Sequence, residues 1–383
     1  MLLETPFRYE EPLAPDELVD REDELAALLA RARGARNTRV TAPRRYGKTS
    51  LLRRLLRDAD LEGIVGVYVD FYGVLTVADV AARIELAYER NLRGPLRTWL
   101  GGVLRTLRPV GRVSAGPAAV EARLGEGAPD PAGTALLERL ALPLRVAERT
   151  GQTVLVVFDE FQALLGAGGT IDALFRSEIQ HHGDRVAYVF AGSQVGMMRE
   201  LFADRRRPFF DQAAPLALPP LPAPAIVEHL DHAFGTTGRS LGEALDPLLA
   251  LADGHPQRAM QLAAHLWAHT ARGEEADASA WAGALRTVGA EVDDDFRARW
   301  DALPASSQRA LSAIAAGDPP FGRAGRERHG TTKGAARGGL DRLADLGEIE
   351  ADPEAAPGYR IVDPLLRVWV AAGRRWPELP AER

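Results

Sequence analysis

The chain has 383 residues, of which 46% are hydrophobic and 26% are charged, and this composition argues against wholesale disorder. Its formal net charge of −6 gives no general attraction to nucleic acid, and the absence of Cys excludes disulfides and thiolate metal sites. The N-terminus shows no signal-peptide pattern and no apolar run reaches about 18 residues. We therefore expect a cytoplasmic protein with no membrane partner, in which any DNA binding depends on a local basic patch.

The first quarter of the chain alternates between helical and strand patterns. Residues 21–36 place leucines at helical spacing, and a short strand is expected at 38–42. A helix with an apolar stripe follows over 48–61, then a strand over 63–74 and an amphipathic helix over 77–92. Strands that alternate with helices predict a parallel sheet, so the fold class is α/β.

The next segment, 93–133, has scattered Gly and Pro and is interpreted as an insertion that forms a small hairpin. A helix is expected over 134–150. Five consecutive apolar residues at 154–158 predict a strand buried on both faces, and a further strand is expected at 186–192. A Pro-rich joint over 215–225 predicts the end of this domain.

The rest of the chain predicts two further domains. Helical patterns fill residues 226–285, with one break at Asp-Gly-His-Pro-Gln. An acidic stretch that begins at residue 291 suits a helix N-terminus, so we place the second boundary near 288. The predicted domains are an α/β domain at 1–222, a helical lid at 223–287 and a C-terminal domain at 288–383.

One loop carries the strongest chemical signal. Only two of the 47 basic residues are lysines, and one of them, Lys48, follows Gly47 between an expected strand and an expected helix. This spacing matches the Walker A phosphate loop, in which Lys48 contacts the outer phosphates and Thr49 holds Mg²⁺. Because the loop must curl around a polyphosphate, we expect Gly47 where a side chain would collide with it. Ala42, where the stricter motif has Gly, fits if its φ is negative. The alternative, an accidental Gly-Lys-Thr helix start, is disfavoured by the flanking elements. The predicted ATP-binding residues here are Ala42, Pro43, Arg44, Arg45, Tyr46, Gly47, Lys48, Thr49 and Ser50.

An acidic pair ends the buried strand that follows. In an open parallel sheet the ligand lies at the carboxyl ends of the strands, so Asp159 would position Mg²⁺ and Glu160 would activate water, as in a Walker B motif. The alternative is a solvated strand end. Ser193 or Gln194, after the next strand, would lie beside the γ-phosphate. A base beside the metal favours hydrolysis over kinase chemistry, and the absence of an Asn-Lys-x-Asp signature favours adenine over guanine.

In their order, these motifs resemble the prokaryotic archaeal-type ATPase family, relatives of the AAA+ and STAND ATPases and of archaeal origin-recognition proteins. The stretches that carry the resemblance run along almost the whole chain: LVDREDEL at 18–25, APRRYGKTSLL at 42–52, VYVDFYGV at 67–74, VVFDEFQ at 156–162, FAGSQVGMM at 190–198, GHP at 254–256 and IVDPLLRVWV at 361–370. The resemblance implies a P-loop NTPase sheet with an additional strand between the Walker A and Walker B strands. The strand at 63–70 would lie at the far edge of the sheet, and the sheet would be followed by a helical lid and a C-terminal winged helix.

The resemblance also implies that Arg21 lies near the adenine and that the lid closes over the nucleotide through His255 and Pro256. Asp20 stands where the family usually has Gly. For an arginine finger or sensor, Arg207 and Arg258 are candidates, without a choice between them.

The C-terminal domain shows the order helix, helix, two-stranded wing that is typical of a winged helix. Within 321–337 only Glu327 is acidic, so the segment predicts a basic patch for duplex DNA. Its members are Arg323, Arg326, Arg328, Lys333 and Arg337. Winged helices also bind proteins, and no Asn or Gln for base contacts lies on this face.

Two functions remain open from the sequence. In the first, the chain is a Mg²⁺-dependent ATPase that switches between ATP and ADP forms, and in the second it is a DNA-binding or regulatory adaptor that holds ATP as a structural ligand. Oligomerisation and a protein partner are compatible with both.

Overall fold

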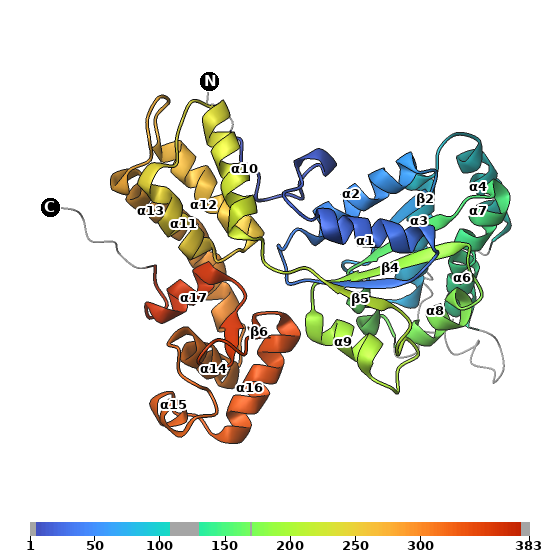
Figure 1. Ribbon diagram of the computed structural model, residues 1–383. Coiled ribbons are helices and arrows are strands. Elements are labelled where there is room, and N and C mark those ends of the chain that lie inside the picture. The colour runs from blue at the N-terminus through green and yellow to red at the C-terminus, as the bar shows by residue number, and fades with distance from the viewer. Residues whose placement is uncertain (1–4, 108–129, 169–170, 377–383) are drawn as a thin grey trace, which may run out of the picture.

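The computed structural model describes residues 5–107, 130–168 and 171–376 and shows the expected parallel sheet (Figure 1). Its strand order is β2-β3-β4-β1-β5, and all pairings are parallel. The prediction that the strand after the phosphate loop lies at the far edge is confirmed. The strands are β1 (Thr38–Thr41), β2 (Val65–Asp70), β3 (Val154–Asp159), β4 (Val186–Gly192) and β5 (Ala214–Ala217).

The interior strands β3 and β4 are buried along their whole lengths because helices cover both faces of the sheet. Leu155 and Val157 point to one face, where they pack with α1 (Glu22–Arg33) and α2 (Lys48–Leu61). Val156 and Phe158 point to the other face and meet α3 (Val77–Asn91) and the helices that follow it. The apolar stripe that we expected on α2 is fully buried at Leu51, Leu52 and Leu55.

The hairpin expected within 93–133 is wrong for the part of this segment that the structure describes. Residues 94–106 form a helix, α4 (Gly94–Thr106), because Leu96, Trp99, Leu100 and Val103 have helical spacing and pack on the α3 side of the core. Residues 108–129 of the expected hairpin lie outside the described residues.

The expected helix at 134–150 is two helices, α6 (Pro131–Leu140) and α7 (Leu142–Thr150). Pro143 interrupts the hydrogen-bond ladder and stands in the first turn of α7. The 3-10 helix η2 (Phe161–Gly166) and α8 (Ile171–Ile179) follow β3, and α9 (Val195–Ala203) follows β4.

The lid is helical, as expected, with its break between α11 and α12, where Asp253 and Gly254 have positive φ. The prediction that a helix begins near residue 291 is wrong. The last lid helix begins at the cap Asp277 and continues to Asp301, so residue 288 lies inside it. The acidic residues that suggested a start therefore lie in mid-helix. The helices are α10 (Ala223–Thr236), α11 (Leu245–Ala252), α12 (Pro256–His269) and α13 (Ala278–Asp301).

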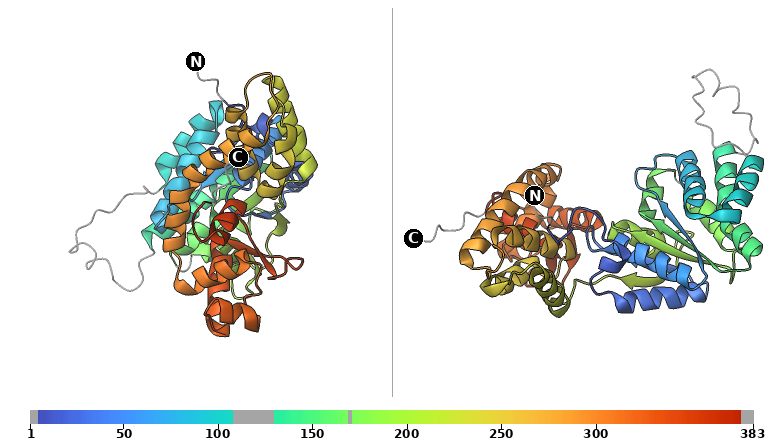
Figure 2. Two further views of the ribbon diagram at one scale, coloured as in Figure 1. Left: turned by 90° about the vertical axis from the view of Figure 1, so that its left-hand side faces the viewer. Right: turned by 90° about the horizontal axis from the view of Figure 1, so that it is seen from above.

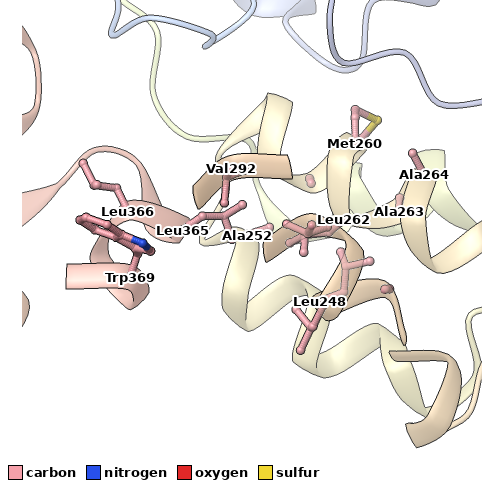
Figure 3. Packing of buried hydrophobic residues seen from close by; sticks show 14 of the residues in the cluster. Leu248, Ala252, Met260, Leu262, Ala263, Ala264, Val292, Leu365, Leu366 and Trp369 are labelled. Carbon is pink, nitrogen blue, oxygen red and sulfur yellow. The ribbon is translucent and has the colours of Figure 1, made fainter. Parts of the chain in front are cut away.

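The C-terminal domain is a winged helix with an antiparallel wing. Its elements are α14 (Ala305–Ala315), α15 (Arg323–Arg328), α16 (Lys333–Leu346), β6 (Ile349–Ala351), β7 (Tyr359–Ile361) and α17 (Pro364–Ala371). Figure 3 shows Leu365 and Trp369 of α17 in one apolar cluster with Val292 of α13 and Ala252 of α11. The lid and the winged helix thus share a core, and Figure 2 shows them as one lobe beside the sheet domain.

Candidate nucleotide site

A cavity of about 690 Å³ lies at the carboxyl ends of β1, β3 and β4. Its walls come from the N-terminal segment, the loop between β1 and α2, the ends of β3 and β4, and the lid helices α12 and α13. The volume falls within the range of small-molecule sites, about 300–1,000 Å³. Both lobes therefore contribute to one cavity, as a nucleotide enclosed by a lid requires.

The loop before α2 has the backbone shape that its sequence predicts. Gly47, the N-cap of α2, has φ +80°, and Arg45 also has a positive φ, whereas Ala42 does not. Ala42 therefore fits a position where the stricter motif has Gly. A Cβ built on Gly47 would meet no atom of the described residues within 4 Å, so the expected collision is one with a bound polyphosphate and stays a prediction. Glycine is favoured here by the left-handed backbone.

Lys48 lies between the two carboxylates of the acidic pair. Its Nζ is 2.6 Å from Oδ1 of Asp159 and 2.9 Å from Oε1 of Glu160. The Thr49 hydroxyl donates to Oδ2 of Asp159 at 3.2 Å, so the predicted Mg²⁺ ligands lie side by side. Burial opposes the charged form of Asp159, but the charge and hydrogen bond of Lys48 outweigh it and lower the pKa of this carboxyl. Asp159 is therefore an anion.

Tyr68 is a site residue that the sequence reasoning missed. Its hydroxyl donates to Oδ2 of Asp159 at 2.7 Å from the neighbouring strand β2. The available signal was the register of the sheet, in which Asp70 pairs with Asp159 and Tyr68 lies two positions earlier on the same face. Burial, followed by the charge of Asp159, raises the pKa of Tyr68 above its ordinary value, so the hydroxyl keeps its proton and fixes the carboxylate.

Three side chains hold the Glu160 carboxylate: Lys48, Ser193 and Gln162. The backbone of Glu160 is left-handed, with φ +51°, a conformation that costs a non-glycine residue on the order of 1 kcal/mol. The Ser193 hydroxyl donates to Oε2 at 2.8 Å, and Nε2 of Gln162 donates to the same oxygen. Ser193 lines the cavity, whereas Gln194 is the N-cap residue of α9 and is not part of the cavity wall. The structure thus brings Ser193, and not Gln194, to the acidic pair.

In the lid, His255 is the N-cap of α12, where its Nδ1 accepts from the Arg258 amide at 3.3 Å. The ring is 2% exposed and packs edge-on against Tyr46, with ring centroids 4.9 Å apart. Burial lowers the pKa of His255 to about 4, so the ring is neutral at pH 7 and acts as a cap. Pro256 lines the cavity in the first turn of the same helix.

This cap makes stability depend on pH. Between pH 6.5 and 4 the unfolded chain binds a proton that the folded His255 does not, so stability decreases as the pH falls. Lowering the pH from 7 to 5 should reduce the free energy of unfolding by about 2 kcal/mol through this residue. Urea unfolding at both pH values tests this, with His255→Asn, which keeps an acceptor, expected to lose that part of the pH dependence. The exposed lid residue His232, changed to Asn, is the matched control, and equal pH dependence in both variants would contradict the assignment.

The candidate arginines lie in different environments. Arg258 lines the cavity and is 2% exposed, with its guanidinium paired to Asp363 of the winged helix at 3.0 and 2.6 Å. Arg207 lies outside the cavity wall and pairs with Asp172 and Glu200. Of these two candidates, the structure therefore places Arg258, and not Arg207, on the wall of the cavity.

Arg21 lines the cavity from the start of α1, where its Nη2 donates to the Pro219 carbonyl at 2.6 Å. Asp20 before it has φ +58°, which explains why Gly is usual there in the family that the sequence resembles. The preceding segment, residues 8–13, also lines the cavity, and no sequence pattern indicated this. Tyr9 holds this segment to the lid, because its carbonyl accepts from Gln257 at 3.0 Å.

The predicted basic patch lies on α15 and α16, apart from the cavity wall. Acids just outside the predicted window reduce its charge, because Arg328 pairs with Asp318 at 2.8 Å and Arg337 approaches Asp341 at 4.0 Å. Arg323 pairs with Glu327 at 2.9 Å, and Arg326 donates to a backbone carbonyl. The patch is thus weaker than the sequence window predicts.

The fold is that of a P-loop ATPase with a helical lid and a winged helix. The structure is similar to the Walker-type ATPase PABY2304 of Pyrococcus abyssi, with a TM-score of 0.69 and 18% identity over 95% of this chain and 99% of that one. It is also similar to the Aeropyrum pernix ORC2 protein in its ADPNP–ADP complexes, with a TM-score of 0.56 and 17% identity over 96% of each chain. No protein-family model and no curated protein matches the sequence. Within the described residues, no helix is long and apolar enough to cross a membrane.

Proposed function

We propose that this protein is a Mg²⁺-dependent ATPase whose lid and winged helix respond to the bound nucleotide. The observation that carries the proposal is the placement of Lys48 between Asp159 and Glu160 at the end of the cavity formed by both lobes. A lysine that neutralises two carboxylates can exchange them for phosphate oxygens, which also carry negative charge. The similar ORC2 structure contains ADPNP and ADP, which supports a nucleotide as the ligand.

The residues present fit a magnesium ion. The Thr49 hydroxyl and the Asp159 carboxylate supply hard oxygen ligands 3.2 Å apart, and Tyr68 orients the carboxylate. Phosphate oxygens and water would supply the remaining ligands. When bound, the ion would neutralise charge on the phosphates.

The chain's own residues can then assist hydrolysis. Phosphates that bind Lys48 would release Glu160, which could accept a hydrogen bond from the attacking water and its proton during reaction. Ser193 and Gln162 hold the same carboxylate by donating to Oε2, so its orientation survives the loss of Lys48. No further general base is needed, and this favours water over a kinase substrate as the acceptor.

The winged helix supplies the second part of the proposal, contact with duplex DNA or a protein. Lys333 and Arg337 are exposed at the start of α16, the helix that enters the major groove in DNA-binding winged helices. The alternative function, an adaptor that holds ATP as a structural ligand, would use the same surface with little turnover.

Steady-state ATP hydrolysis with and without duplex DNA separates these functions, with Lys48→Ala as the blank. We expect DNA to increase turnover and Lys333→Ala/Arg337→Ala to remove most of that increase, because each lost phosphate contact lowers affinity in a salt-dependent manner. The exposed pair Arg90→Ala/Arg149→Ala in the sheet domain is the matched control. Turnover that is absent in both conditions while ATP remains bound would favour the adaptor. DNA-stimulated turnover that is undiminished in the double variant would show that Lys333 and Arg337 are not the DNA contact.

A further inference from the structure

Arg258 is the one candidate sensor on the cavity wall, and a residue of the winged helix holds it. Its Nε and Nη2 bind the two oxygens of Asp363, and its Nη1 donates to Gln261 at 2.6 Å. The guanidinium also lies over the ring of Phe296, 5.5 Å from the centroid. The charge of Arg258 is therefore fully engaged across the boundary between lid and winged helix.

Asp363 is a buried carboxylate, 6% exposed, with several partners. It caps α17 through the Leu365 and Leu366 amides, and it accepts from Nη1 of Arg299 at 3.0 Å. The paired arginines lower its pKa despite burial, so it is an anion. Asp363 thus neutralises Arg258 on the cavity wall, as a phosphate group of a bound nucleotide would.

A second arginine, Arg45, lines the same part of the cavity, so two positive charges lie where an anion could bind. The side chain of Arg45 in the phosphate loop is exposed, and its pKa is lowered by partial desolvation and by the positive charge of Arg258. Both residues line the cavity together with Asp295 of α13. Two arginines that repel each other would be stabilised by a polyphosphate, and without one the nearby carboxylates provide part of that stabilisation.

The winged helix also contacts the sheet domain, at α9 and at the loop after β4 that carries Ser193. A Cβ on Gly196 of α9 would lie 2.2 Å from Oδ1 of Asp345 and 2.8 Å from its Cα, so α9 and α16 are in close contact. A Cβ on Gly347 would lie 3.4 Å from the carbonyl of Ser193, whose hydroxyl binds Glu160. The same domain thus meets the loop after β4 and the lid sensor.

We propose that Asp363 is a positioning residue of the nucleotide site, supplied by the winged helix, and that the terminal phosphate of ATP competes with it for Arg258. ATP then releases the winged helix from the lid arginine and loosens its contact with α9, whereas ADP leaves both contacts in place. The inference rests on the proposed function, because it needs ATP in the cavity. It assigns the coupling between nucleotide and winged helix to one ion pair.

The direct test compares nucleotide affinities of Asp363→Asn by calorimetry, using a non-hydrolysable ATP analogue and ADP. Asn keeps the cap of α17 but not the charge, so Arg258 becomes available to the terminal phosphate. We expect affinity for the ATP analogue to increase about tenfold and that for ADP to change less than about twofold. The matched control is Asp293→Asn, which removes the charge of a different lid carboxylate in contact with the winged helix, the acceptor of a 2.7 Å hydrogen bond from Trp369.

An ATP-to-ADP affinity ratio that is unchanged in Asp363→Asn, or equally changed in Asp293→Asn, would overturn the inference. Wild-type protein that binds neither nucleotide would instead overturn the proposed function.

A second measurement keeps Asp363 and covers the case in which Asp363→Asn fails to fold. The chain has no Cys, so spin labels can be placed at Arg199→Cys on α9 and Arg342→Cys on α16, both exposed positions. We expect the distance between the labels to lengthen with the ATP analogue and to stay unchanged with ADP. The same distance in both nucleotide states would contradict the proposed competition.

Discussion

Replacing Lys48 with Ala is expected to abolish ATP binding, with a loss of affinity of at least about 100-fold. The substitution removes the cation that contacts phosphate, and it also leaves Asp159 and Glu160 as unneutralised anions where the phosphates must lie. Removing one partner of a buried ion pair is also strongly destabilising, on the order of 3–5 kcal/mol. Titration with a fluorescent ATP analogue measures the affinity.

The chain offers a matched control for this change, because its only other lysine, Lys333, is exposed on the winged helix. Lys333→Ala should bind ATP like the wild type. Thermal unfolding of both variants shows whether a loss of binding comes from a loss of fold. Unaltered affinity in a folded Lys48→Ala protein would show that the nucleotide does not occupy this loop.

Replacing Glu160 with Gln is expected to leave ATP bound and to reduce turnover by at least about 100-fold. Gln has nearly the same shape and can still accept the hydrogen bond from Ser193, so the cavity keeps its form. It cannot accept a proton from water. The removed negative charge should also strengthen ATP binding slightly, because one anion fewer competes for Lys48.

Single-turnover hydrolysis and nucleotide titration, carried out on the same preparation, measure both effects. Glu200→Gln is the matched control, since this exposed carboxylate pairs with Arg207 outside the cavity wall. Equal turnover in wild type and Glu160→Gln would remove Glu160 from the mechanism. Loss of ATP binding in Glu160→Gln would assign the residue to binding instead.

Local patterns were sufficient for much of the fold and for the centre of the site. The apolar run at 154–158 is the buried strand β3, and the helix that begins at Lys48, with Gly47 as its N-cap, follows the loop after β1. These features depend on residues close in sequence and on the rule that ligands lie at the carboxyl ends of parallel strands. The same rule correctly brings Asp159 and Glu160 to Lys48, more than a hundred residues earlier in the chain.

What the sequence could not supply depends on contacts between distant segments. Tyr68 reaches Asp159 only through the register of two strands, and Arg258 meets Asp363 only because the lid and the winged helix share a core. The acidic residues after 291 resemble a helix start, yet α13 continues through them because Val292 and Phe296 belong to that core. Local charge preference is worth a few tenths of a kcal/mol, and burial of such side chains outweighs it.

The most direct test of the central claim is a crystal structure of Glu160→Gln with ATP and Mg²⁺. We predict phosphates bound at the N-terminus of α2 with Lys48 moved from Asp159 to the outer phosphates, and a magnesium ion between Thr49 and the terminal phosphates. The nucleotide base should lie between Arg21 and the lid. A nucleotide bound elsewhere, or a cavity in which Lys48 keeps its carboxylate partners at saturating ATP, would contradict the assignment of this cavity as the ATPase site.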